Sequence, residues 1–325
     1  MTRFTLQREG SRLVVATTLL LAQSASAAPL NYLFLGGDDP ASFRTLLERP
    51  DIAGAQVVVP WRTLEPRKGQ YDFSSIEADL AVTRAVNKQL FVQVQDRFFD
   101  PRDRGVPDYL LNDPSYGGGL AQQVDFAGEG KPVGSGWVAR QWDPRVRARF
   151  QALLKALAAR FDGRLAGVNL PETAADVTRA ERRKGFSCDA YFRGELDNLA
   201  VARSAFKHTQ VVQYVNFWPC EWNNDHRFME RTFAFALAHG IGLGGPDVVP
   251  NRKGQMKNSY PFFHRFKGKL PLVAMAVQEP TLTYSNPETG KRFTKQEIVE
   301  FADEYLGANI IFWTPAAPWL KQGRT

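Results

Sequence analysis

Two glutamates directly follow apolar, strand-like segments and are the residues best suited to catalysis. Glu172 ends the run Gly167-Val-Asn-Leu-Pro-Glu172, and Glu279 ends the run Val273-Ala-Met-Ala-Val-Gln-Glu279. A charged carboxylate beside a buried segment is costly unless it is paired or hydrogen-bonded. Two carboxyl groups that face each other could break a glycosidic bond: one protonates the leaving oxygen, and the other attacks the anomeric carbon or activates a water molecule.

The elements that would position these glutamates are eight short apolar segments, each typical of a strand. Most are continuously apolar rather than alternating, as parallel strands buried on both faces are. The predicted strands cover Asn31–Leu35, Ala55–Val59, Gln89–Gln95, Leu165–Leu170, Gln210–Phe217, Ile241–Gly244, Leu270–Gln278 and Asn309–Trp313.

Amphipathic segments with helix-start signals lie between the strands. Ser74-Ser-Ile-Glu77 and Thr294-Lys-Gln-Glu297 have the pattern of a capping box and predict helices that run to about residues 86 and 306. Asp143-Pro144 gives an N-cap followed by proline at the first helical position, and an apolar stripe then runs to Phe161. Two further helices are predicted over residues 191–206 and 228–238.

Eight strands alternating with helices predict an α/β protein, a single-domain (β/α)8 barrel of the TIM type. A chain of 325 residues could also hold two domains or a doubly wound sheet, but it has no Gly-rich loop of the phosphate-binding type. Only 12 residues follow Trp313, so the eighth helix is expected to be short or missing. The Gly- and Pro-rich residues 97–142 are expected to stand over the C-terminal face, where sites of this fold lie.

Residues that come just after each strand line the site of such a barrel. Glu172 and Glu279 would follow strands four and seven, which are three apart in a ring of eight, so the two carboxylates could face each other. Tryptophans at strand ends could stack on the C–H faces of sugar rings. The predicted substrate-binding residues are Trp61, Arg62, Gln95, Asn169, Trp218, Asp247 and Trp313.

The run Trp61-Arg-Thr-Leu-Glu-Pro-Arg-Lys-Gly-Gln-Tyr-Asp-Phe73 resembles the W-x-x-L-E-P-x-x-G-x-Y-D-F run that follows the second strand in many clan A glycoside hydrolases. The resemblance implies a (β/α)8 barrel with Glu172 as acid/base, Glu279 as nucleophile and a retaining outcome. Trp313 matches the aromatic residue that is common at the end of strand eight in that clan. Glu65, inside the run, is expected to stabilise the turn rather than to catalyse.

Two departures from the pattern of that clan suggest a divergent family. Pro171 stands directly before Glu172, where the clan usually has asparagine, and Asn169 lies three residues ahead of the glutamate. After Glu279, Pro280-Thr281 replaces the usual aromatic or glycine signature.

Two alternatives to a two-glutamate hydrolase therefore stay open. The first is a barrel that binds a glycan without cleaving it, which Pro171 favours. The second is a barrel hydrolase or lyase that uses other strand-end carboxylates, namely Glu221 or Asp247.

The first 27 residues predict a signal peptide. Three arginines precede an apolar run of 10 residues, and Ala25-Ser-Ala27 is a small-residue cleavage site. Ten apolar residues are too few to span a bilayer, which needs about 20, and no later segment predicts a membrane span. Cleavage after Ala27 would leave a domain of 298 residues (28–325) and lower the formal charge from +7 to +5. The mature protein is expected in the periplasm or outside the cell.

The chain has 2 cysteines, Cys188 and Cys220, which lie beyond the ends of the neighbouring fourth and fifth strands. A disulfide between the two loops is expected, because the predicted compartment is oxidising and neighbouring loops bring the thiols within reach.

The net positive charge is only weak evidence for an acidic binding partner, because Arg and Lys are spread over the predicted helices. No nucleic-acid partner is expected, since no binding motif is present. The expected partner is an oligo- or polysaccharide, and Arg62, Arg97, Arg102 and Arg104 near the predicted mouth would suit an anionic one. The four histidines show no ligand spacing, so neither a catalytic metal nor a cofactor is expected.

Overall fold

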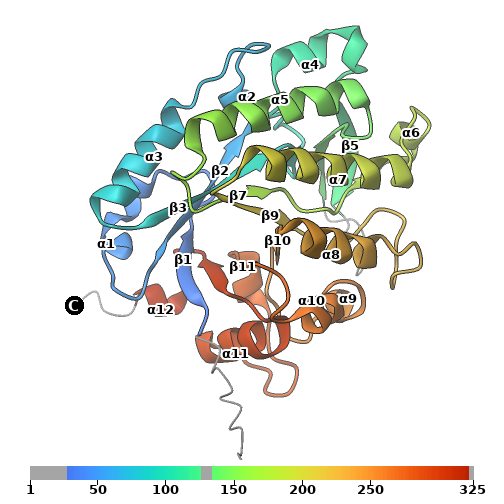
Figure 1. Ribbon diagram of the computed structural model, residues 1–325. Coiled ribbons are helices and arrows are strands. Elements are labelled where there is room, and N and C mark those ends of the chain that lie inside the picture. The colour runs from blue at the N-terminus through green and yellow to red at the C-terminus, as the bar shows by residue number, and fades with distance from the viewer. Residues whose placement is uncertain (1–27, 126–133, 322–325) are drawn as a thin grey trace, which may run out of the picture.

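Eight parallel strands close into a barrel in the computed structural model, which describes residues 28–125 and 134–321 (Figure 1). The order around the ring is β1-β12-β11-β10-β9-β7-β3-β2. Closure of the sheet confirms the predicted single-domain (β/α)8 barrel and excludes a doubly wound sheet. The strands are β1 (Leu30–Phe34), β2 (Gly54–Pro60), β3 (Gln89–Gln95), β7 (Gly167–Leu170), β9 (Gln210–Tyr214), β10 (Gly242–Gly245), β11 (Val273–Val277) and β12 (Ile310–Trp313). The predicted signal peptide, residues 1–27, lies outside the described residues.

Every predicted barrel strand is present, and the differences lie at the strand ends. β9 ends at Tyr214, so Asn216 and Phe217 belong to the loop at its carboxyl end and not to the strand. β11 likewise covers only the middle of the predicted segment, from Val273 to Val277. Strand ends are where a loop and a strand of similar composition look alike in a sequence.

The interior of the barrel is filled by aromatic side chains from different strands. The rings of Tyr32, Phe91 and Phe312 meet edge to face, with centroids 5.3 to 5.6 Å apart. Gly167 on β7 makes room for them, because a Cβ there would lie 2.0 Å from the ring of Phe91. The barrel is therefore a packed core, and a ligand must bind at its end.

Helices surround the barrel and bury a second, larger apolar layer against it (Figure 1). The apolar stripe predicted from Val146 to Phe161 is buried on α5. The longer helices are α3 (Ser74–Ala85), α5 (Pro144–Phe161), α7 (Cys188–Ala205), α8 (Phe228–His239), α10 (Tyr260–Phe266) and α11 (Lys295–Glu300), which continues as a π-helix over Phe301–Leu306. The shorter helices are α1 (Arg44–Leu47), α2 (Trp61–Leu64), α4 (Asp108–Asn112), α6 (Arg179–Arg182), α9 (Lys253–Asn258) and α12 (Pro318–Lys321). Single 3-10 turns span Pro40–Phe43, Pro114–Tyr116 and Pro280–Thr283.

Only one of the two predicted capping boxes forms. Thr294 and Glu297 exchange the two hydrogen bonds of a capping box at the start of α11. At the start of α3, Ser74 instead donates its backbone N–H to the carboxylate of Asp72 at 2.9 Å. Glu77 turns away to bind two arginines of the neighbouring α5 region, Arg160 and Arg164, and this stronger pairing explains why the second prediction is wrong.

The segment inserted after β3 forms a small antiparallel sheet over the barrel. Its strands β4 (Arg97–Phe98), β5 (Leu120–Asp125) and β6 (Gly134–Ala139) pair with β8 (Asp176–Val177), which follows β7, in the order β4-β6-β5-β8. Figure 1 shows β5, α4 and α6 gathered at one end of the barrel. The insertion therefore stands over the carboxyl ends of the strands, as predicted.

The run Trp61–Phe73, which carries the resemblance, forms a structural cluster. Trp61 donates its indole N–H to Glu65 Oε2 at 2.9 Å, and the backbone N–H of Gly69 donates to Glu65 Oε1 at 2.8 Å. Arg149 of α5 also pairs with this completely buried carboxylate. The predicted structural role of Glu65 is confirmed, and the run serves to fasten the loop after β2 to α5.

Two further expectations concern the chain end and the membrane. The last described helix, α12, has only four residues, which agrees with the predicted short eighth helix. Among the helices of the described ranges, none has both the length and the apolar composition that crossing a bilayer would require.

Candidate active site

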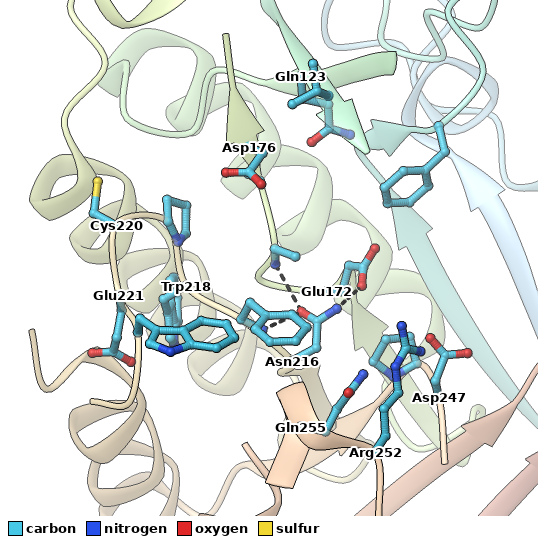
Figure 2. A pocket seen from close by; sticks show the side chains of 18 of the residues that line it. Gln123, Glu172, Asp176, Asn216, Trp218, Cys220, Glu221, Asp247, Arg252 and Gln255 are labelled. Atoms are coloured by element: carbon cyan, nitrogen blue, oxygen red, sulfur yellow. Dashed lines mark hydrogen bonds between the residues drawn. The ribbon is translucent and has the colours of Figure 1, made fainter. Parts of the chain in front are cut away.

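A cavity of about 660 Å³ opens at the carboxyl ends of the barrel strands, beneath the inserted sheet. Its volume suits a small ligand or part of a larger one. The side chains come from loops after β7, β9, β10 and β11, from α9 and from the insertion, as Figure 2 shows for part of the set. The polar lining residues are Gln123, Glu172, Asp176, Arg182, Asn216, Cys220, Glu221, Asp247, Arg252, Gln255, Gln278 and Tyr284; the apolar ones are Phe99, Val124, Ala174, Ala175, Phe217, Trp218, Pro219, Trp222, Pro246 and Pro280.

Glu172 lies in this cavity just beyond β7, where the sequence places it. Its Oε2 accepts a hydrogen bond from the side-chain amide of Asn216, which follows β9 (Figure 2). The amide oxygen of Asn216 accepts in turn from the backbone N–H groups of Phe217, at 2.8 Å, and Ala174, at 3.2 Å. These two bonds fix which end of the amide points at the glutamate, so the carboxylate is held by a donor that cannot turn away.

A buried arginine supports the segment that carries Glu172. Arg97 is 1% exposed and donates to the carbonyl oxygen of Ala174 at 2.9 Å. It is balanced by the buried carboxylates of Asp96, at 3.4 Å, and Glu195, at 3.3 Å. Glu172 also attracts this guanidinium electrostatically. Burial raises the pKa of Glu195, and Arg97 opposes that shift.

Asp247 is a second carboxylate that faces the cavity, from the loop after β10. It accepts a hydrogen bond from the hydroxyl of Thr281 at 2.8 Å. Its backbone carbonyl is held by the hydroxyl of Tyr260, also at 2.8 Å. Figure 2 shows Asp247 and Arg252 on the same side of Glu172. Both the side chain and the backbone of Asp247 are therefore anchored.

Glu279 occupies a different position from Glu172. It directly precedes a 3-10 turn after β11, and its side chain is exposed. Its chain neighbours Gln278 and Pro280 line the cavity, but Glu279 is not among the lining residues. The structure thus brings together Glu172 and Asp247, while Glu279 borders the cavity from outside.

Two other carboxylates, Glu221 and Asp176, line the cavity and already interact with neighbouring groups. Glu221 accepts hydrogen bonds from the backbone N–H groups of Phe228 and Met229, and so caps the first turn of α8. Burial raises the pKa of Glu221, and those N–H groups oppose the shift. Burial also raises the pKa of Asp176, and the positive charge of Arg182 opposes that shift. The capping role makes Glu221 a structural carboxylate.

The tryptophans predicted to contact sugars divide into two groups. Trp218 lines the cavity, although it is only 3% exposed and packs edge to face against Phe192. Trp61 is completely buried, so its indole offers no face to a ligand. Trp313 is 1% exposed, donates its N–H to Asn31 and packs against Trp319. The expectation that Trp61 and Trp313 hold substrate is therefore corrected: both are core residues.

The remaining predicted substrate contacts lie away from the cavity. Arg62 pairs with Asp108 at 2.8 Å on the surface. Gln95 donates its side-chain amide to the carbonyl oxygen of Arg97 at 2.6 Å. Asn169 is completely buried on β7, inside the barrel. None of these three predicted contacts is among the lining residues.

The arginines expected near the mouth are also occupied by other contacts. Arg97 is buried in the pairings described above, and Arg102 pairs with the adjacent Asp100 at 2.6 Å. Arg104 stacks over the ring of Trp137 at 4.2 Å. The cations that line the cavity are instead Arg182 and Arg252. An anionic substrate in the cavity would therefore meet these two arginines and not the predicted ones.

The predicted disulfide is confirmed. Cys188, the first residue of α7, is bonded to Cys220 in the loop after β9, with a Cα–Cα distance of 6.2 Å. It ties the wall of the cavity to α7. In the described part of the chain, no group of three or more His, Cys, Asp or Glu side chains is arranged to hold a metal ion.

Sequence reasoning missed Asn216, Arg252, Gln255 and Tyr284. Asn216 was hidden because the apolar segment around it reads as strand up to Phe217. Arg252 and Gln255 lie at and just inside the start of α9, and Tyr284 follows the 3-10 turn after β11, so all three stand several residues beyond a strand end. Only the folded chain brings them beside Glu172.

Comparison with known proteins identifies the fold. No protein-family model matches the sequence, and no curated protein matches it significantly. The catalytic domain of a β-amylase from Paenibacillus polymyxa superposes with a TM-score of 0.54 at 9% identity, covering 88% of this chain and 93% of that chain. A thermostable mutant of a xylanase from Cellvibrio japonicus gives 0.52 at 12% identity, covering 92% and 90%. A family 39 glycoside hydrolase from Bacteroides cellulosilyticus gives 0.53 at 10% identity, covering 88% of this chain and 56% of that one.

The fold and the cavity together define a (β/α)8 barrel of the kind found in glycoside hydrolases, with acidic side chains at its C-terminal face. The resemblance carried by Trp61–Phe73 is thus confirmed at the level of the fold. Identities this low show the fold alone, and they agree with the divergence inferred from Pro171 and Pro280.

Proposed function

We propose that this protein is a glycoside hydrolase in which Glu172 transfers the proton at the glycosidic oxygen. The observation that carries the proposal is the orientation of Glu172: it projects into a cavity at the end of β7 and is held by Asn216. In a barrel, a carboxyl at this position meets a ligand that is bound at the C-terminal face. The fold shared with glycoside hydrolases supports a carbohydrate as that ligand.

The proposed reaction is a double displacement. Glu172 protonates the leaving oxygen while Glu279 attacks the anomeric carbon, so that the aglycone leaves as an alcohol and a glycosyl ester forms on Glu279. Glu172, now a carboxylate, takes a proton from water, which attacks the same carbon and releases Glu279. The outcome is retention at the anomeric carbon. The place of Glu279 two residues after the end of β11, between two residues that line the cavity, supports this role.

Asp247 is the alternative second carboxylate, because it lines the cavity together with Glu172. A carboxylate that activates water rather than attacking carbon would give inversion, and it stands further from the acid, at about 6.5–9.5 Å instead of about 5–5.5 Å. The stereochemistry of the product therefore distinguishes the two assignments.

A second candidate function is glycan binding without hydrolysis. The exposed position of Glu279, outside the lining of the cavity, favours it. In this case the cavity would hold a saccharide, but no pair of carboxyl groups would act on one bond.

Export is the final part of the proposal. The charged start, apolar run and small-residue site of residues 1–27 support cleavage and release to the periplasm or the medium. The disulfide between Cys188 and Cys220 is compatible with an oxidising compartment. N-terminal sequencing of the protein from culture fractions should find Ala28 as the first residue.

The test is a hydrolysis screen with neutral, amino and uronic-acid oligosaccharides, followed by four variants. Glu172→Gln should abolish turnover of a natural glycoside, and Glu279→Gln should do so if the proposed mechanism is correct. If the reaction inverts, Asp247→Asn should abolish turnover instead of Glu279→Gln. Proton NMR of the first-formed anomer shows independently whether the configuration is retained or inverted. Glu288→Gln, on an exposed loop, is the matched control. Full turnover by Glu172→Gln would refute the proposal, and saccharide binding without turnover by the wild type would favour the binding barrel.

A further inference from the structure

The loop that follows β9 displays two aromatic side chains in the wall of the cavity. Phe217 and Trp222 both line it, together with Trp218, Cys220 and Glu221 of the same loop. Their ring planes are 3° apart with centroids separated by 6.3 Å, so the rings are parallel and displaced sideways. Together they form an extended apolar surface rather than a closed stack.

Trp222 differs from the core tryptophans in its exposure. Its residue is 39% exposed, whereas Trp61, Trp218 and Trp313 are at most 3% exposed. Leaving so large an apolar ring in contact with water is unfavourable unless something covers it in the working state. The exposed ring lines the same cavity as Glu172, so a ligand in that cavity could cover it.

The backbone of the loop is held from several sides. Cys220 is bonded to Cys188, and the carboxylate of Glu221 is fixed on the first turn of α8. The N–H of Trp222 donates to Asp225 at 3.0 Å, and the N–H of Asn223 donates to Asn258 at 2.7 Å. The residue that bears the exposed ring thus lies between anchored neighbours.

The loop also adopts an unusual backbone conformation. Cys220, Asn223, Asn224 and Arg227 all have positive φ angles, between 55° and 67°. Asn adopts this conformation readily, but it is unfavourable for Cys220 and Arg227, and such conformations persist where the surrounding structure imposes them. The backbone that carries Trp222 is therefore held in a defined conformation on both sides of this residue.

We propose that Phe217 and Trp222 form a stacking platform for a sugar ring of the substrate, and that this ring is a pyranose with equatorial substituents. Such a ring carries only axial C–H groups on its faces, so it presents a flat apolar surface to the aromatic pair. An axial hydroxyl on the stacked face would place a polar group against the aromatic surface. The inference rests on the proposed function, because it assumes that the cavity binds a carbohydrate.

The amine of Lys257 lies 5.3 Å from the ring centroid of Trp222. A cation beside the ring would also favour an acidic group on the bound sugar, but the platform itself requires only the C–H face. Trp319 makes a convenient comparison, because Lys295 lies 3.6 Å from its ring and the ring does not line the cavity.

The experiment measures binding of cellohexaose, xylohexaose, chitohexaose and mannohexaose by calorimetry, using the mature chain with Glu172→Gln to prevent turnover. Trp222→Ala should weaken binding of the preferred equatorial hexasaccharide by about tenfold or more. Trp222→Phe should restore most of the affinity, while Trp319→Ala should change nothing. Thermal melting of each variant verifies that it is folded.

The possible outcomes distinguish failure of the stacking proposal from failure of the proposed carbohydrate-binding function. Equal affinity of Trp222→Ala and its parent would overturn the platform while leaving a carbohydrate site intact. Preference for mannohexaose would overturn the equatorial class of sugar. No binding of any of the four probes, by protein that melts cooperatively, would count against the platform and against carbohydrate binding together. With the catalytic glutamate restored, Trp222→Ala should raise KM for hexasaccharides and leave kcat nearly unchanged.

Discussion

Asn216 donates its side-chain amide to the carboxylate of Glu172, although the two residues are 44 positions apart and follow different strands. The bond depends on the closure of the barrel, because β7 and β9 are hydrogen-bonded neighbours in the ring. Two backbone N–H groups fix the amide oxygen of Asn216, so only its NH2 group can face the glutamate. Pro171 stands directly before Glu172, and the loop after the neighbouring strand β9 supplies an amide to the carboxylate.

Asn216 is therefore expected to be a positioning residue. Asn216→Ala removes the donor and lets the carboxylate rotate, which should lower kcat by up to about 100-fold with little change in KM. Asn216→Asp should lower kcat further, because a second negative charge beside Glu172 favours its protonated form and moves the alkaline limb of the activity profile to higher pH. The pH dependence of kcat checks this; an unshifted profile in both variants would mean that the contact only stabilises the fold.

The fold could be predicted closely from the sequence, whereas the site could be predicted only in part. Continuous apolar segments such as Val273–Val277 identify buried parallel strands because both faces must be covered. Glu172 was predictable because a carboxylate directly follows such a strand. Asn216 was not, because a polar residue inside an apolar run does not reveal where the strand ends. Arg252 was not, because it stands seven residues beyond β10, before the start of α9, and only the folded loop brings it to the cavity.

Trp61 shows how a specific motif can mislead about function while it identifies the fold correctly. Its position after β2 suggested a sugar contact, but its indole N–H is used by Glu65 and its ring packs edge to face on Phe150. The motif is specific because a buried carboxylate, an indole and Arg149 must all fit together. The motif is therefore evidence for the fold and not for a sugar-binding role of Trp61.

Glu65→Ala should destabilise the protein strongly, by about 3–5 kcal/mol, because it leaves the Arg149 guanidinium and the indole N–H of Trp61 without their shared acceptor. The residual activity per folded molecule should stay at the wild-type level, since Glu65 does not line the cavity. Urea unfolding gives the free energy, and active-site titration gives the activity of the folded fraction. A stable but inactive Glu65→Gln variant would contradict the structural role.

Removal of the disulfide should weaken the fold and loosen the wall that carries Trp222. Cys188 and Cys220 close a loop of 32 residues, for which the loss of the cross-link is worth about 3–4 kcal/mol. The double variant Cys188→Ser, Cys220→Ser should therefore unfold at lower urea concentration, and reduction of the wild type should have the same effect. If dithiothreitol leaves the urea midpoint unchanged, the disulfide does not stabilise the folded chain.

Glu77 should make stability depend on acid pH. Hydrogen bonds from Arg164, together with Arg160, lower the pKa of Glu77 from 4.5 to about 2. A carboxyl whose pKa is lower in the folded state contributes stability above its unfolded value, and this contribution disappears as the pH falls through the folded value. The difference in free energy of unfolding between wild type and Glu77→Gln should thus be full at neutral pH and vanish between about pH 4.5 and about pH 2. Urea titrations across this range test it, with Glu288→Gln as the control for loss of one exposed charge; a difference that persists unchanged at the lowest pH would show that the ion pairs are not its source.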